Sequence, residues 1–148
     1  MQSERKRLCR GFGQIARMPL FCRRDKYPGR ATNSMIRNGL YHITVEMLDS
    51  VQGGNQGVMV MRDGQLRGGD SFFFAHGNYT SANGKWKGEV TNEEHTPTYG
   101  ARPVWERKVV TIGFTGTYTD ETAEADGIAL AGKQSIRFKS RLRLLIPD

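Results

Sequence analysis

The sequence predicts an all-β domain, a single eight-stranded antiparallel up-and-down barrel. From residue 35 onward, apolar and polar residues alternate with a period of two, as they do in strands with one buried face. Short turn signals separate these segments, which leaves no room for parallel crossovers. No segment after residue 34 has the period of an amphipathic helix. A meander of this size hides its edges completely only by closing, so a barrel is favoured over a two-sheet sandwich.

The expected strands are bounded by residues that favour turns. Asp63-Gly64 and Asn83-Gly84 accept positive φ at low cost and are strong hairpin signals. Gly132-Lys133 suits the last turn, and His95–Val104 is the one long loop. The expected strands, in order, are Tyr41–Met47, Val58–Arg62, Gln65–Arg67, Ser71–Thr80, Lys85–Glu94, Glu106–Thr119, Glu121–Ala131 and Gln134–Leu145.

The last hairpin has a predicted register. If Gly132-Lys133 is a two-residue turn, small and apolar residues meet on one face and charged residues meet on the other. The expected opposite pairs are Asp126 with Lys139, Glu124 with Arg141, Thr122 with Arg143, Ala125 with Ser140 and Ala123 with Leu142. The last strand carries a row of alternating basic residues, Arg137, Lys139, Arg141 and Arg143. This pairing offsets much of their charge. A nucleic-acid face is therefore not the expected use of that row.

Residues 1–34 form a basic segment that we expect to be disordered and to lie outside the barrel domain, which spans 35–148. They hold nine Lys/Arg and two acids, so their net charge is +7, and the remaining residues balance at 13 basic and 13 acidic. Both cysteines, Cys9 and Cys22, also lie there. The segment could be a basic arm, a transit peptide, or an extension upstream of a true start at Met35. The last is favoured, so removing residues 1–34 should leave the melting temperature unchanged.

Nothing in the sequence predicts catalysis, a cofactor or a metal site. The three histidines, His42, His76 and His95, lack metal-ligand spacing, and residues 35–148 contain no cysteine. Gly68-Gly69-Asp70 is expected to make a sharp strand bend or bulge. We expect Asp63, Gly64, Gly68, Gly69 and Asp70 to have a structural role and no catalytic one. No apolar run approaches the length of a membrane span.

A set of aromatic residues is expected to form core, and could instead line a cavity for a small apolar ligand. Its members are Phe72, Phe74, Tyr79, Trp86, Phe114 and Tyr118.

The segment from Gly57 to Asp70, Gly-Val-Met-Val-Met-Arg-Asp-Gly-Gln-Leu-Arg-Gly-Gly-Asp, resembles the negative regulators of type III secretion, the GrlR-like family. Asn38-Gly39-Leu40-Tyr41 also fits that family. The resemblance implies a cytoplasmic bacterial regulator with a lipocalin-like barrel that is often dimeric. It also implies a non-enzymatic adaptor that binds a protein partner such as a transcriptional activator, through acids on a surface loop.

This sequence departs from the family at that loop. The matching residues are Ser81-Ala82-Asn83-Gly84, which include no acid. The best replacement is an acidic stretch at the start of the expected seventh strand, whose members are Asp120, Glu121, Glu124 and Asp126. We therefore expect a regulatory adaptor that uses this acidic set, with a small-molecule-binding barrel as the alternative. A second copy of the chain is a further candidate partner.

Overall fold

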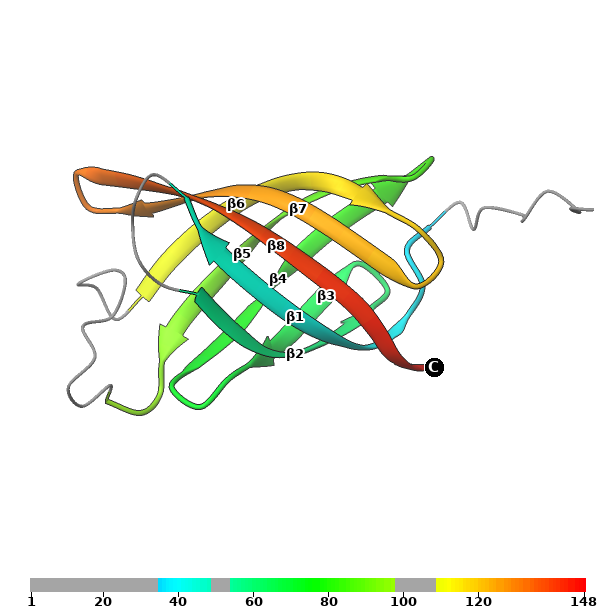
Figure 1. Cartoon of the computed structure of the whole chain (residues 1–148), viewed down its shortest axis with the longest axis horizontal. Helices are drawn as coiled ribbons and strands as arrows, with labels where there is room; N and C mark the ends of the chain where they lie inside the picture. Colours follow the sequence, from blue (N-terminus) through cyan, green and yellow to red (C-terminus); the bar gives the residue numbers. More distant parts are fainter. Residues whose placement is uncertain (1–34, 49–53, 98–108) are drawn as a thin grey trace, which may run out of the picture. The chain divides into compact units, whose positions relative to one another are not determined.

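Eight antiparallel strands of the described residues close into one barrel (Figure 1). The structure is a computed structural model, and it describes residues 35–48, 54–97 and 109–148. Each strand pairs with the next along the chain, and β8 pairs back with β1. The strands are β1 (Gly39–Met47), β2 (Gly54–Arg62), β3 (Gln65–Gly69), β4 (Phe73–Ala82), β5 (Lys85–Glu94), β6 (Val109–Tyr118), β7 (Thr122–Ala131) and β8 (Gln134–Pro147). The barrel prediction is confirmed, and the sandwich alternative is wrong.

Two parts of the prediction lie outside the described residues. The expected disorder of residues 1–34 is one of them, and most of the expected loop, from residue 98 to 104, is the other.

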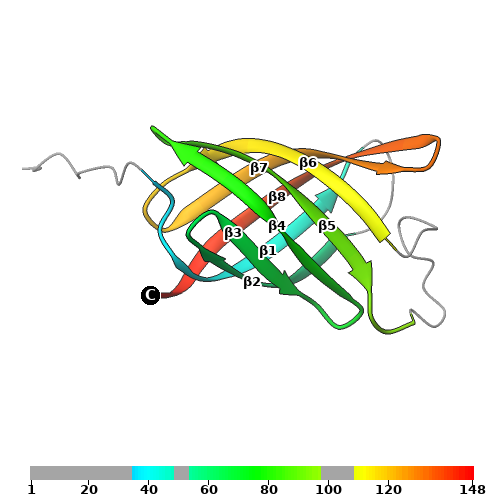
Figure 2. The ribbon, with the colours of Figure 1, turned by 180° about the vertical axis from the view of Figure 1, so that it is seen from behind.

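The two predicted hairpin turns have the backbone that their residues favour. The φ angles of Asp63 and Gly64 are 50° and 81°, and those of Asn83 and Gly84 are 53° and 78°. Positive φ at both central residues belongs to the type I′ turn, whose twist matches that of paired strands. These turns join β2 to β3 and β4 to β5, and Figure 2 shows β4 and β5 on the wall of the barrel opposite β8.

The predicted register of the last hairpin is confirmed. Asp126 pairs with Lys139, Glu124 with Arg141 and Thr122 with Arg143. Ala125 and Ala123 pair with Ser140 and Leu142 on the buried face, as expected.

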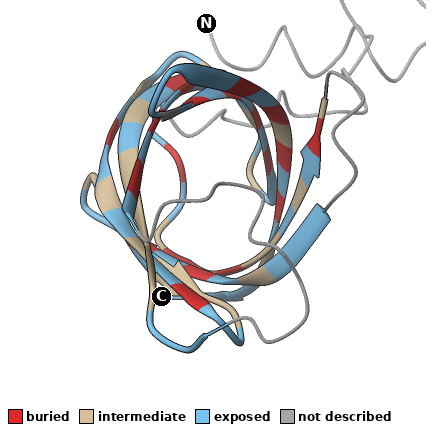
Figure 3. Ribbon diagram, turned by 90° about the vertical axis from the view of Figure 1, so that its left-hand side faces the viewer, coloured by how far each residue is buried: buried red, intermediate tan, exposed pale blue. Residues whose placement is uncertain are grey.

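The barrel interior is filled from alternate positions of the strands, and these buried residues appear as red bands between exposed ones along the ribbons of Figure 3. One buried cluster gathers around Tyr41, Met61 and Trp86, and a second around Val110, Ala129 and Phe138. The half-buried Val90 packs against both clusters. The core therefore runs along the barrel as two joined layers.

Residues 35–38 close one end of this core. The side chain of Ile36 is only 5% exposed and packs in the first cluster. Its amide donates to Ser81 Oγ at 3.1 Å, and the Tyr41 hydroxyl donates to the Arg37 carbonyl at 2.7 Å. The entry to β1 is thus held by both packing and hydrogen bonds.

The Gly-Gly-Asp motif makes a close strand crossing and a tight turn. A Cβ at Gly68 would collide with the Val58 carbonyl, so glycine is required by the approach of β2. The register continues through Gly68 and Gly69 without a shift, so they form no bulge. Asp70 Oδ1 then accepts the amides of Phe72 and Phe73, at 2.8 and 2.9 Å. The shift in register lies instead where β8 meets the start of β1.

Candidate functional site

Four of the six aromatic residues expected as core or cavity lining lie inside the barrel. The rings of Tyr79 and Trp86 meet edge to face at 6.0 Å, and Trp86 lies 4.6 Å from Phe114 between ring centroids. Tyr118 packs against the same cluster. Trp86 Nε1 donates to the Glu124 carbonyl at 2.9 Å, which satisfies the one polar atom of the buried indole. These rings pack on one another as core.

Phe72 and Phe74 do not line the interior, and this part of the expectation is corrected. They are 41% and 40% exposed, whereas Phe73 between them is 8% exposed. The reason is the period of the strand. Tyr79 faces inward, and on β4 only residues an even number of positions from it share its face. Phe73 meets that condition, so the spacing in the sequence could have predicted that Phe73, and not Phe72 or Phe74, faces inward.

Phe74 instead lies on the outer face between two histidines. Its ring stacks on His76 at 6.1 Å and lies 6.5 Å from His95, measured between ring centroids. His76 Nε2 is also 3.4 Å from Glu93 Oε1.

The four acidic residues do not form one free surface. Glu124 forms an ion pair with Arg141, with 3.4 Å between Oε1 and Nε. Asp126 stands opposite Lys139 in the ladder, and Asp120 interacts with a neighbour. Glu121 is exposed in the turn between β6 and β7. The pairing of β7 with β8 therefore offsets part of their charge.

A group of apolar side chains on the outer face was missed by sequence reasoning. We name it the apolar patch, and it consists of Leu40 on β1, Val58 and Val60 on β2, and Ile146 on β8. Leu40 pairs with both Val60 and Ile146, so the side chains are adjacent. Val58, Val60 and Ile146 are 47%, 42% and 61% exposed. The sequence feature that could have indicated this patch is the run Val58-Met-Val-Met61, which places apolar residues on both faces of its strand.

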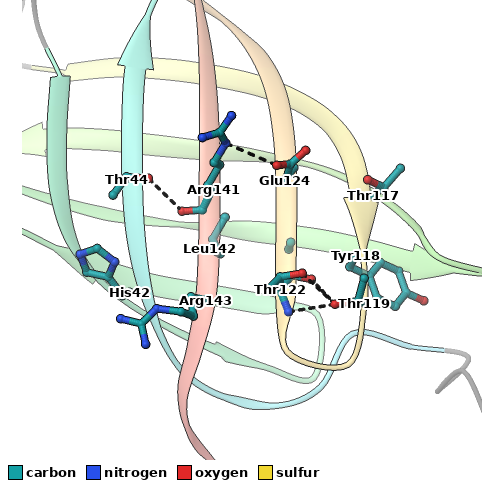
Figure 4. A pocket seen from close by; sticks show the side chains of 11 residues that line it. His42, Thr44, Thr117, Tyr118, Thr119, Thr122, Glu124, Arg141, Leu142 and Arg143 are labelled. Carbon is teal, nitrogen blue, oxygen red and sulfur yellow. Dashed lines mark hydrogen bonds and ion pairs between the residues drawn. The ribbon is translucent and has the colours of Figure 1, made fainter. Parts of the chain in front are cut away.

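A polar hollow lies beside this patch, across the outer face of β1, β8, β7 and β6 (Figure 4). Its volume is about 450 Å³. Four threonines, two arginines, a histidine and an acid contribute most of its lining, namely Thr44, Thr117, Thr119, Thr122, Arg141, Arg143, His42 and Glu124. His42 also pairs with Val58, so the hollow and the apolar patch share a border.

Other classes of site are less supported by the described residues. Within them, no group of three or more His, Cys, Asp or Glu side chains is placed to hold a metal ion. No helix of the described chain could cross a membrane.

The largest pKa change among the described residues belongs to Tyr41, which lies in the core. Burial and the neighbouring Tyr79 raise the pKa of Tyr41 to about 12, and Arg37 has an opposing effect.

Comparison with known protein families finds no match for this chain, and comparison with curated proteins finds none either. The resemblance to the GrlR-like family therefore stays a prediction that rests on the residues quoted for it.

Proposed function

We propose that this protein is a non-enzymatic regulatory adaptor, which binds a protein partner through the outer face of its barrel. The observation that supports the proposal most is the apolar patch. Its side chains are adjacent across three strands; Val58, Val60 and Ile146 are exposed and Leu40 is half-buried between them. Soluble proteins seldom leave a contiguous apolar patch without a use, and such patches commonly mark interaction sites.

The edges of the patch favour a protein partner. Arg62 and Asp148 form an ion pair of 2.8 Å beside it, and Arg67 pairs with Val60 from β3. An apolar centre with a polar rim is the usual anatomy of a protein interface. The patch contains none of the acidic set, so the proposal moves the expected contact from β7 to β1, β2 and β8.

A small apolar ligand inside the barrel is the alternative, and the described core favours it less. The interior positions that could line a cavity are filled by rings that touch one another, from Tyr79 through Trp86 to Phe114. A ligand at that end would have to displace packed aromatic side chains. The resemblance adds support for a regulator that acts in the bacterial cytoplasm, with a transcriptional regulator as the partner.

The test is photo-crosslinking from the patch in a lysate of the host. A photoreactive phenylalanine analogue replaces Val60 in one variant and Thr115, an exposed residue on the outer face of β6, in the control. The proposal expects one discrete crosslinked protein from position 60 that is absent from position 115. Val60→Asp in competition should fail to suppress that crosslink, whereas the unmodified protein should suppress it.

Three other outcomes would count against the proposal or change it. Equal crosslinking from both positions would show that the patch has no special role. A crosslink with the mass of two chains would identify a second copy as the occupant, and sedimentation at several concentrations would then measure the dimer. A small molecule retained in native mass spectrometry, without a protein crosslink, would favour the ligand-binding alternative.

A further inference from the structure

The outward side chains of β8 form a row of four cations, in which the surroundings of one differ from the rest. Lys139 is flanked by Glu46 on β1 and Asp126 on β7. Arg141 has Glu124 as its ion-pair partner. Arg137 also interacts with a neighbour. Each of these three cations therefore has an acid beside it or another interaction partner.

Among the residues that the structure describes, Arg143 has no such partner. Its neighbours in the ladder are His42 on β1 and Thr122 on β7, and neither is acidic. In the part of the chain that the structure describes, no carboxylate forms an ion pair with Arg143. The pattern that offsets the other cations therefore stops at this position.

The Arg143 guanidinium, which no described carboxylate pairs with, lies at the polar hollow. Figure 4 shows the Arg143 side chain extending over β1 on the side of His42, while Arg141 turns the other way toward Glu124. Both groups present N–H donors to the same outer surface. On the other side of β8, the Thr119 and Thr122 hydroxyls are 2.7 Å apart, and the Thr119 oxygen also accepts the Thr122 amide at 3.1 Å. The turn that edges the hollow is thus held in place by its own hydrogen bonds.

We propose that the hollow at Arg143 and His42 binds an oxyanion, a carboxylate or a phosphate-type group. Arginine presents a planar set of donors that matches two oxygens of such a group. The neighbouring imidazole of His42 adds a ring N–H donor. The site stands apart from the apolar patch in chemistry, although His42 borders Val58.

The charge distribution favours a single oxyanion over a nucleic-acid backbone. A backbone track needs several free cations in a row. Here Arg141 and Lys139, the next two outward residues of β8, already face acids. One unpaired arginine beside one histidine suits one charged group. That group is either a free anion or an acidic side chain of a bound protein.

The test is an NMR titration of the full chain with sodium sulfate, with chloride used to hold ionic strength constant. Sulfate keeps the same charge near neutral pH, so its own protonation does not enter the result. The His42 ring proton and the Arg143 Nε–H are the reporters, which makes the readout specific to the hollow. The proposal expects both signals to shift and to saturate.

Arg143→Gln is the test variant and Lys139→Gln is the matched control on the same face of β8. Arg143→Gln should weaken sulfate binding about tenfold or more, which corresponds to the loss of one charge-assisted hydrogen bond. Lys139→Gln should leave the affinity unchanged. A shift that does not saturate, or one that is equal in both variants, would overturn the proposal.

A second arm separates the two sources of the oxyanion. A short capped peptide of glutamates replaces sulfate, with the same two variants; the His42 ring proton is the reporter that the parent, Arg143→Gln and Lys139→Gln share. Saturation by sulfate identifies a site for a free anion. Saturation by the peptide alone identifies a site for an acidic protein segment, and the absence of both overturns the assignment. A negative result here leaves the crosslinking test of the apolar patch unaffected, because the two use different residues.

Discussion

Glu124 on β7 and Arg141 on β8 stand opposite each other in the ladder and form an ion pair, with 3.4 Å between Glu124 Oε1 and Arg141 Nε. Both side chains are more than half exposed. The pair joins the two strands that the register prediction concerned, and its exposure limits what it contributes to stability.

A double-mutant cycle of Glu124→Gln and Arg141→Gln should give a coupling energy of about 0.2–1 kcal/mol, the usual value for an exposed pair. The measurement is urea unfolding at low salt and again at high salt. Screening should remove most of the coupling. A coupling that persists at high salt would show that the pair acts through packing instead.

Two glycines of β6 form a matched comparison. A Cβ at Gly116 would collide with the Glu124 carbonyl and crowd the Cα of Ala125, whereas a Cβ at Gly113 would meet nothing within 4 Å. Gly116→Ala should therefore destabilise the barrel by about 1–3 kcal/mol, the usual cost of overpacking. Gly113→Ala should be neutral or stabilise by about 0.4–1 kcal/mol, because it restricts the unfolded chain. Chemical denaturation of both variants tests this order, and equal effects would contradict it.

Ile36 should contribute to stability although it lies before β1. Its side chain is buried in the first cluster, whereas that of Met35 is 58% exposed. Ile36→Ala should cost about 2–5 kcal/mol, the range for a buried aliphatic side chain. Met35→Ala is the control and should change the free energy of unfolding little. If the two variants unfold at the same denaturant concentration, the closing role of residues 35–38 is wrong.

Tyr41 should make the barrel sensitive to strong alkali. Its pKa is raised to about 12 from the usual 10.0 of a tyrosine, mainly by burial. A raised pKa means that the folded state holds the proton more tightly, so this stability is fully present below pH 10. It is lost as the pH rises toward 12.

Tyr41→Phe tests that account, because it removes the ionisable group and also the hydrogen bond to the Arg37 carbonyl. The variant should lose less stability than the parent between pH 10 and 12. At neutral pH it should be less stable by about 0.5–1.5 kcal/mol, the net value of one hydrogen bond. Unfolding followed by circular dichroism across this pH range gives both comparisons.

The strand pattern could be predicted because several signals agreed on it. In the last hairpin, one register satisfies the turn, the apolar face and the charge pairs together. The start of β2 could not be predicted in the same way. Residues 54–57 are Gly-Asn-Gln-Gly and have no apolar alternation, yet they pair with β1 through their main chain. Main-chain pairing depends on the neighbouring strand, which a local pattern does not show.

The candidate surfaces were harder to predict than the fold. The acidic set was chosen by closeness in the sequence, but the pairing of Glu124 with Arg141 on β8 offsets part of its charge. The apolar patch combines residues from β1, β2 and β8, which are far apart in the chain. Such a patch exists only once the barrel closes. The unpaired state of Arg143 likewise depends on which residues stand beside it on β1 and β7.

The pairing of β8 with β1 makes the order of strands a cycle. Asp148 donates its amide to the Asn38 carbonyl at 3.2 Å, and its carboxylate accepts Arg62 Nε at 2.8 Å. A short peptide could therefore connect Asp148 to Met35, which keeps Ile36 in the core, and the chain could be opened at the exposed Gly132-Lys133 turn instead. Such a circular permutant would keep every strand neighbour of the barrel. The closed pairing of the strands therefore does not depend on which strand the chain begins with.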